Sequence, residues 1–221
     1  MKTKKIELYI HIPFCKSKCR YCDFCSFQAE NAVIDDYITK LKEELIFWGK
    51  KLTKEEVVTV FIGGGTPSYL KEQYIKEICN VIFQYFKVSE NAEITIEANP
   101  GTVDLKKLCT YRESGINRIS FGLQSTIQEE LQYLGRIHTY EQFLQCYNWA
   151  REAGFCNISV DLMSAIPKQT IHSYEKNLRT IAELSPEHIS AYSLIIEEGT
   201  PFYEDENLED LLPSEEDEVR M

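Results

Sequence analysis

The chain has 221 residues, of which 43% are hydrophobic and 27% are charged, as is ordinary for a soluble protein of one domain or two small ones. Its net charge of −11 comes largely from residues 203–221, which hold nine acidic residues and one Arg, so the remainder is nearly neutral. These features exclude the basic surface of a nucleic-acid-binding protein and an apolar run that could cross a membrane. We expect a cytoplasmic protein in which the eight cysteines are thiols or metal ligands rather than disulfides.

Short β-branched segments alternate with longer amphipathic ones along the whole chain. The pattern predicts strands at residues 7–12, 57–62, 93–97, 117–121, 157–162 and 188–195. It predicts helices at residues 34–51, 73–86, 103–114, 140–153 and 171–184. Thr102 and Thr139 are expected to be helix N-caps, and Gly115 and Gly154 are expected to end helices in the left-handed conformation.

Six strand–helix units with apolar strands predict an α/β fold with a buried parallel sheet. An open, partial TIM-type barrel and a doubly wound sheet both satisfy this pattern. In either fold, functional side chains gather at the carboxyl ends of the strands. The unusual residues of the sequence do follow strand ends, at Cys15, 63–67, 97–100, Gln124 and 161–167.

A cysteine cluster follows the first predicted strand, with Cys15, Cys19 and Cys22 in a C-x3-C-x2-C spacing. Three thiols in one loop can ligate three irons of a [4Fe-4S] cluster and leave the fourth iron free to chelate S-adenosylmethionine (SAM). A zinc site is the alternative, with Cys25 or His11 as a fourth ligand, although no second C-x2-C pair follows. Cys25 is therefore either a spare thiol or an alternative ligand.

The other four cysteines, Cys79, Cys109, Cys146 and Cys156, stand alone in or beside predicted helices. Solitary cysteines of this kind usually behave as small hydrophobic residues. We expect all four to be buried.

Two further strand ends carry candidate ligand-binding residues. Residues 63–67 read Gly-Gly-Gly-Thr-Pro, which lets a backbone approach a ligand closely or simply forms a tight turn. A P-loop is a poor interpretation, because no Lys-Ser/Thr follows the glycines. Glu97 ends a strand, where a carboxylate is often a solvated or capping group. Asp161 lies within an apolar strand, where burial without a partner would be costly.

The cysteine loop, with the aromatic Tyr21 before its last Cys, resembles the radical SAM superfamily. The longer string LYIHIPFCKSKCRYCDF is similar to the branch that holds coproporphyrinogen dehydrogenases and HemW-type heme chaperones, and the similarity runs to about residue 218. The resemblance implies one [4Fe-4S] cluster on Cys15, Cys19 and Cys22. It also implies a pocket for one or two SAM molecules lined by Tyr9, Tyr21, Gly64, Gly65, Thr66, Glu97, Gln124, Arg136 and Asp161. Within that pocket, Glu97 would pair with the SAM ammonium or with Arg136.

The resemblance leaves two functions open. One is a heme chaperone that delivers heme to acceptor proteins, and the other is SAM-dependent oxidation of coproporphyrinogen III. The dehydrogenases carry a long N-terminal extension and a further cysteine two residues after the third ligand, where this chain has Phe24. These differences favour the chaperone. Either function implies a tetrapyrrole and an electron donor such as flavodoxin or ferredoxin, and no nucleic acid.

Residues 1–200 are expected to form the radical SAM core, an open, partial TIM-type barrel of about six β-α units with the cysteine loop at its C-terminal rim. Residues 201–221 are expected to form an acidic linker toward a further C-terminal domain. The His-Asn-x-x-Tyr-Trp heme motif of the chaperones is absent from the sequence. Repulsion among like charges predicts that residues 204–218 are mobile in isolation. Without a closing domain, we expect this chain not to decarboxylate coproporphyrinogen III.

Overall fold

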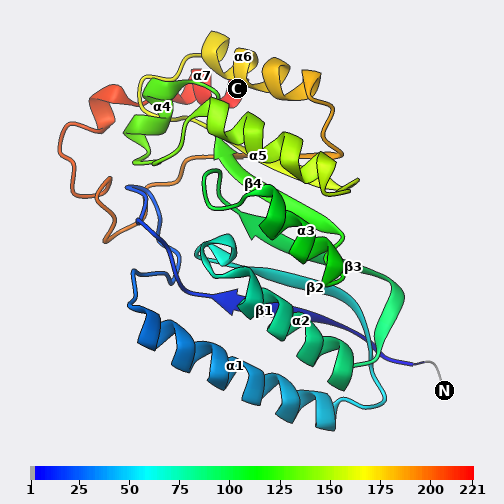
Figure 1. Ribbon diagram of the computed structural model, residues 1–221. Helices are drawn as coiled ribbons and strands as arrows, with labels where there is room; N and C mark the ends of the chain where they lie inside the picture. The colour runs from blue at the N-terminus through cyan, green and yellow to red at the C-terminus, as the bar shows by residue number, and fades with distance from the viewer. Residues whose placement is uncertain (1–2) are drawn as a thin grey trace.

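The computed structural model describes residues 3–221. Its centre is one sheet of six parallel strands whose spatial order follows the chain, from β1 at one edge to β6 at the other (Figure 1). The strands are β1 (Lys5–Ile12), β2 (Glu56–Gly64), β3 (Val88–Ala98), β4 (Arg118–Gln124), β5 (Ile158–Ser164) and β6 (His188–Ser193). A doubly wound sheet would reverse its strand order at a switch point. The sequential order and the separate β1 and β6 edges confirm the open, partial TIM-type barrel.

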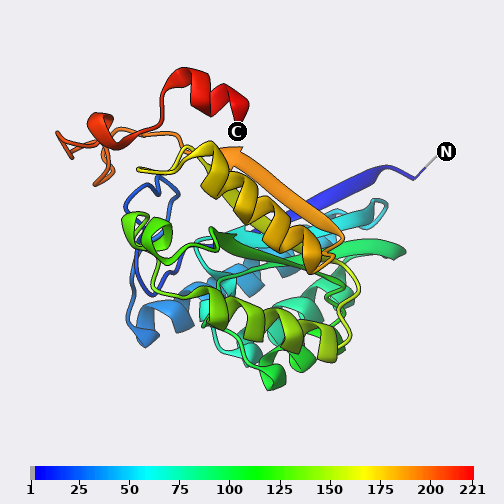
Figure 2. The same cartoon turned by 90° about the horizontal axis from the view of Figure 1, so that it is seen from above.

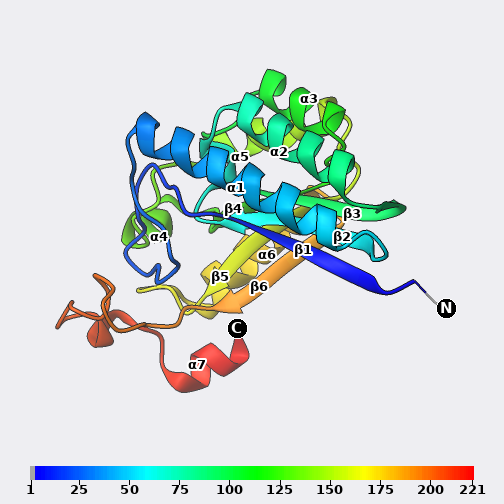
Figure 3. The ribbon, with the colours of Figure 1, turned by 90° about the horizontal axis from the view of Figure 1, so that it is seen from below.

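The helices that follow the strands cover one face of the sheet. Figure 3 shows α1, α2, α3 and α5 side by side along it, while α6 packs against β5. The helices are α1 (Asn31–Lys51), α2 (Glu72–Tyr85), α3 (Leu105–Glu113), α4 (Gln128–Tyr133), α5 (Tyr140–Glu152), α6 (Ile171–Glu183) and α7 (Glu215–Arg220). Two 3-10 turns lie at Pro67–Tyr69 and Glu209–Leu211. No helix within residues 3–221 is both long enough and apolar enough to cross a bilayer.

The two faces of the sheet differ in polarity. On β1, Ile10 and Ile12 are buried toward the helices, whereas Glu7 and Tyr9 on the opposite face are exposed. The same alternation places Glu97 of β3 on the open face, between the buried Ile96 and Ala98. The open face is therefore polar, and its carboxyl end holds the candidate site.

The predicted helix ends are mostly correct, with one exception. Thr139 caps α5 through a capping box with Gln142, and Gly115 and Gly154 adopt φ of +90° and +89°. The Thr102 prediction is wrong, because α3 begins later and Asp104 accepts a hydrogen bond from the Lys107 amide. Thr102 instead donates its hydroxyl to the Asn99 carbonyl, 2.6 Å away.

The solitary cysteines divide into two groups. Cys79 and Cys146 are buried, as predicted, and burial raises the pKa of the Cys79 thiol to about 12. Cys109 is only half-buried and Cys156 is exposed, which contradicts the prediction for these two residues. Cys156 follows the turn at Gly154, where the chain runs on the surface before β5.

The acidic segment after β6 packs against the body through its few apolar residues. Phe202 and Leu208 are buried in a second apolar cluster that includes Leu134, Met163 and Ile166. Figures 1 and 2 show this segment beside the loop after β1. The expectation that it has little to bury is therefore wrong at Leu208. Its mobility and its role as a linker remain predictions.

One side chain of the cysteine loop fastens this segment. Arg20 forms an ion pair with Asp205 at 2.8 Å, and its guanidinium lies 4.9 Å from the Phe202 ring centroid. The Arg20 carbonyl also accepts a hydrogen bond from the Phe202 amide at 3.1 Å. An ion pair, a cation–π contact and a backbone hydrogen bond thus join the cysteine loop to the acidic segment.

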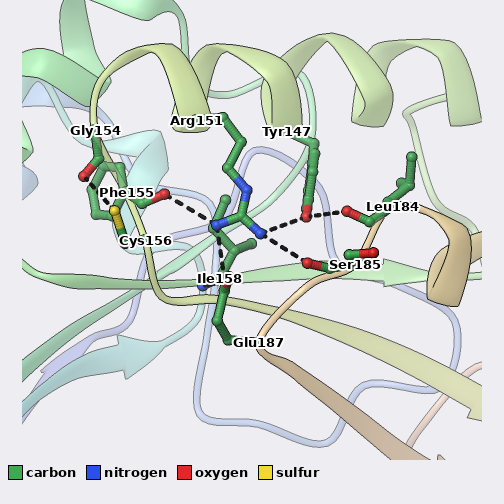
Figure 4. A network of polar contacts seen from close by, with 9 residues as sticks. All are labelled: Tyr147, Arg151, Gly154, Phe155, Cys156, Ile158, Leu184, Ser185 and Glu187. Carbon is green, nitrogen blue, oxygen red and sulfur yellow. Dashed lines mark hydrogen bonds and ion pairs between the residues drawn. The ribbon is translucent and has the colours of Figure 1, made fainter.

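We expect Arg20→Ala to raise amide exchange across residues 200–208 about fivefold, because a half-exposed ion pair and a cation–π contact together stabilise by about 1 kcal/mol. The measurement is hydrogen exchange with mass spectrometry on the metal-free protein. Figure 4 shows the matched control, Arg151, which pairs with Glu187 at 2.9 Å and lies over the Tyr147 ring at 5.1 Å. Arg151→Ala removes the same kinds of contact and should leave residues 200–208 unchanged. Equal exchange in both variants would contradict the prediction.

Candidate metal and cofactor site

The loop between β1 and α1 is fixed at both of its ends. The Cys15 amide donates to the Phe27 carbonyl at 3.0 Å, and the Phe27 amide donates to the Pro13 carbonyl at 2.9 Å. Phe14 is fully buried and packs edge-on against the rings of Phe27 and Tyr37. The loop is thereby anchored to the core, while its middle, with the cysteines, faces the carboxyl end of the sheet.

Cys15, Cys19 and Cys22 line one cavity of about 360 Å³ at the carboxyl end of the sheet. Within residues 3–221, no three Cys, His, Asp or Glu side chains are grouped to hold a single metal ion. Cys25 is exposed and does not line the cavity. The backbone carbonyl of Cys25 accepts a hydrogen bond from His11 Nε2 at 2.9 Å.

The glycines after β2 fit closely between the cysteine loop and β1. Gly64 has φ +114°, and a Cβ there would lie 2.6 Å from the His11 ring. A Cβ on Gly65 would lie 3.0 Å from Cys15 Sγ. The Gly65 and Thr66 amides donate to the carbonyls of Ile12 and Phe14 at 2.8 and 2.9 Å. The glycines are required because the backbone itself forms the cavity wall beside Cys15.

Four acidic residues line the cavity, and two of them, Glu97 and Asp161, are largely removed from solvent. Within residues 3–221, no cationic side chain is hydrogen-bonded to either of these two carboxylates. Glu97 accepts a hydrogen bond from the Gly64 amide at 3.0 Å, and Asp161 accepts one from the Ser120 hydroxyl at 3.1 Å. Burial raises the pKa of Glu97 to about 7, with a further contribution from the Asp161 charge. Burial likewise raises the pKa of Asp161 to about 6. A cationic ligand would stabilise the ionised form of both carboxylates and lower both pKa values, so the cavity suits a positively charged group.

Of the two alternative partners predicted for Glu97, the SAM ammonium and Arg136, the structure contradicts Arg136. The Arg136 guanidinium donates to Asn99 Oδ1 at 2.6 Å, to the Gly122 carbonyl, and to Cys19 Sγ at 3.4 Å. These contacts hold it on the cysteine side of the cavity.

The structure brings eight of the nine predicted SAM residues together around the cavity. Tyr9 is the exception, because it is 60% exposed and does not line the cavity. Its hydroxyl lies 3.0 Å from His11 Nδ1. Since the Cys25 carbonyl can only accept, His11 Nε2 donates, and in neutral His11 the Nδ1 accepts from the Tyr9 hydroxyl. The eight lining residues are Tyr21, Gly64, Gly65, Thr66, Glu97, Gln124, Arg136 and Asp161.

Among the lining residues that the sequence did not predict as ligand-binding, Tyr192 and Asn99 make hydrogen bonds to predicted ones. Tyr192 of β6 donates its hydroxyl to Gln124 Oε1 at 2.8 Å, and Gln124 itself adopts φ +74°. Asn99 bridges Thr66 and Arg136. Neither belongs to a recognisable motif, although the position of Asn99 directly after β3 is the signal that could have found it.

The donor set fits a [4Fe-4S] cluster that has one iron free of protein ligands. Three thiols surround a cavity, and two of their sulfur atoms accept hydrogen bonds, Cys15 from the Thr66 hydroxyl and Cys19 from Arg136. Such donors stabilise the thiolate form that iron requires. The same cavity holds Glu97, Gln124 and Asp161, the polar groups that an amino acid and a ribose would need.

The sequence profile of the radical SAM superfamily matches residues 9–181 of this chain. The chain belongs to the radical SAM superfamily. This confirms the family that the cysteine loop and the strand-end residues predicted. In the superfamily, a [4Fe-4S] cluster and SAM are the cofactors.

Relatives and solved structures place the chain within this superfamily. It is 40% identical over 196 residues to the heme chaperone HemW of Bacillus subtilis, covering 88% of this chain and 52% of that protein. It is 39% identical to HemW of Escherichia coli, covering 91% of this chain and 54% of that protein. The structure of the Escherichia coli coproporphyrinogen III oxidase HemN, a radical SAM enzyme, matches with a TM-score of 0.89 and 29% identity, covering 99% of this chain and 50% of that one. The chain thus spans about half the length of the relatives it matches.

We expect Glu97 to make the stability of the metal-free protein fall as pH rises. The folded pKa of about 7 lies above the ordinary value of 4.5, so the folded state holds the proton more tightly than the unfolded state. This contribution is fully present below about pH 4.5 and is lost as pH rises through 7. Glu97→Gln keeps a neutral side chain, so it should exceed the parent chain in unfolding free energy by about 3 kcal/mol at pH 8 and match it at pH 4.5.

Urea denaturation at several pH values measures this difference. The control is Glu152→Gln at the exposed end of α5, which should show no such pH-dependent difference. A constant difference between Glu97→Gln and the parent chain at all pH values would contradict the raised pKa.

Proposed function

We propose that this chain is the radical SAM core of a HemW-like heme chaperone, holding one [4Fe-4S] cluster on Cys15, Cys19 and Cys22. The observation that carries the proposal is the single cavity that brings these three thiols together with eight predicted SAM residues. The 40% identity to a heme chaperone over 88% of the chain supports the chaperone branch. None of the eight cysteines of the described chain forms a disulfide, which supports a reducing compartment such as the cytoplasm.

Each residue has a definite role in this proposal. The three thiolates would hold a [4Fe-4S] cluster and leave one iron free of protein ligands, able to bind the amino and carboxylate groups of SAM. Glu97 would accept a hydrogen bond from the amino group of SAM, because its buried carboxylate faces the cavity beside the Gly64 amide. Gln124 and Asp161 bind ribose hydroxyls. The chemistry that the reduced cluster supplies when bound is one-electron cleavage of SAM to methionine and a 5′-deoxyadenosyl radical. An electron donor such as flavodoxin or ferredoxin would reduce it.

A second candidate function is oxidation of coproporphyrinogen III, favoured by the TM-score of 0.89 to HemN. Phe24 is the feature that weighs against it. This residue lines the cavity and is 68% exposed, where the resembling dehydrogenases carry a further cysteine. An exposed aromatic side chain at the cavity mouth instead offers an apolar contact to a flat macrocycle such as heme.

The test is anaerobic reconstitution followed by three assays. SAM should alter the EPR spectrum of the reduced cluster, and hemin should bind with a shifted Soret absorbance. Coproporphyrinogen III incubated with SAM and reductant should remain unchanged by chromatography. Stoichiometric formation of protoporphyrinogen would contradict the chaperone assignment and support the oxidase. An unchanged EPR spectrum at saturating SAM would contradict the SAM-binding site.

A further inference from the structure

Two hydrogen-bond donors reach two of the three cluster cysteines from different parts of the chain. The Thr66 hydroxyl, after β2, lies 3.4 Å from Cys15 Sγ. The Arg136 guanidinium, after α4, has Nη1 at 3.4 Å from Cys19 Sγ. The cysteine loop provides neither donor, so something else must hold both in place.

Asn99 joins these two donors. Its Nδ2 lies 2.9 Å from Thr66 Oγ1, and its Oδ1 lies 2.6 Å from Arg136 Nη2. A guanidinium has no acceptor, so the amide oxygen must face Arg136 and the amide nitrogen must face Thr66. The Thr66 hydroxyl therefore accepts from Asn99, and its one proton is left to point at Cys15 Sγ. The charge on Arg136 thus fixes the direction of a hydrogen bond to a sulfur on the other side of Asn99.

Neighbouring residues hold the backbone of Asn99 and leave room for its side chain to bridge Thr66 and Arg136. Its backbone amide donates to Ser68 Oγ at 3.1 Å, and its carbonyl accepts from Thr102 Oγ1 at 2.6 Å. A Cβ on Gly122 of β4 would lie 2.8 Å from Asn99 Oδ1 and 3.2 Å from Arg136 Nη2. The bridge therefore requires both a fixed turn after β3 and a glycine on β4.

We propose that Asn99 is a positioning residue that aims two hydrogen bonds at the cluster thiolates and so sets the reduction potential and retention of the cluster. The inference rests on the proposed function of the three cysteines. Donors to thiolate sulfur stabilise the reduced cluster, which carries more negative charge, and therefore raise its potential. Loss of the bridge should lower the potential and loosen the cluster.

The experiment compares variants of the whole chain after anaerobic reconstitution. Asn99→Leu removes both amide contacts. Asn99→Asp keeps an acceptor for Arg136, but it turns the Thr66 proton toward itself and away from Cys15. Both variants should lower the midpoint potential in an EPR-monitored redox titration and release iron to a chelator about tenfold faster. Thr66→Val should shift the potential in the same direction.

The matched control is Asn117→Leu. This asparagine also makes two side-chain hydrogen bonds, to the backbone of Ile94 and Ala92 in the middle of β3. It should lower the melting temperature and leave the potential unchanged. An unmoved potential in Asn99→Leu and Asn99→Asp, or an equal shift in Asn117→Leu, would overturn the inference while leaving the cluster assignment intact. A parent chain that assembles no [4Fe-4S] cluster would instead overturn the proposed function, and this inference with it.

Discussion

Replacing Cys15, Cys19 or Cys22 by Ala should abolish the [4Fe-4S] absorbance of the anaerobically reconstituted chain, which should otherwise hold about four irons and four sulfides. The three thiols line one cavity, and no fourth cysteine within residues 3–221 lines it to take the place of a lost ligand. A cluster held by two thiolates would have two irons without protein ligands. We therefore expect loss of the cluster rather than a modest change in its properties.

Cys25→Ala is the matched control, since Cys25 lies only three residues beyond Cys22. Cys25 is exposed, and its backbone carbonyl accepts a hydrogen bond from His11 Nε2. Alanine keeps that carbonyl, so iron and sulfide content should remain at the level of the parent chain. Loss of the cluster in Cys25→Ala would assign Cys25 as a ligand and contradict the three-cysteine site.

The strands were predictable because each one is a short β-branched run between helices with clear amphipathic patterns. The main error is β3, which begins at Val88, five residues before the predicted start. Residues 88–92 read Val-Ser-Glu-Asn-Ala and lack a strand pattern, yet Val88 pairs with Val57 before the register shifts. The open barrel was predicted correctly, but periodicity alone does not distinguish it from a doubly wound sheet, because periodicity does not say which strands become neighbours.

The candidate site also contains residues that the sequence predicted and residues that it did not. The cysteines and the glycine loop were predictable because their chemistry depends on spacing within one short segment. Asn99 and Tyr192 were not, because their partners Arg136 and Gln124 lie 37 and 68 positions away in the chain. Arg136 illustrates this limit, since the sequence placed it in the cavity but offered it only as one of two alternative partners of Glu97 and did not identify its hydrogen bond to Asn99.

The short helix α4 was also missed, because six residues give too little periodicity to detect. Its Glu130 is buried and accepts hydrogen bonds from Ser125, Gln169 and Asn177. These partners come from three separate segments. Such a network forms only after the fold brings them together, and it holds the loop that leads to Arg136.

Gly64→Ala should reduce SAM binding by about a hundredfold and lower the melting temperature of the metal-free chain. Gly64 has φ +114°, where an L side chain is strained, and its new Cβ would lie 2.6 Å from His11 Cε1 and Nδ1. His11 cannot easily move aside, because Tyr9 and the Cys25 carbonyl hold its two ring nitrogens. The backbone must shift instead, and with it the Gly64 amide that binds Glu97.

Gly154→Ala separates this clash from the cost of positive φ alone. Gly154 has φ +89°, and a Cβ there meets no atom within 4 Å. That variant should lose about 1 kcal/mol of stability and keep the full response of the cluster EPR spectrum to SAM. Because Gly64→Ala adds a collision beside the cavity to the same backbone strain, its EPR response should be lost at SAM concentrations that saturate Gly154→Ala. An equal response in the two variants would remove Gly64 from the SAM site.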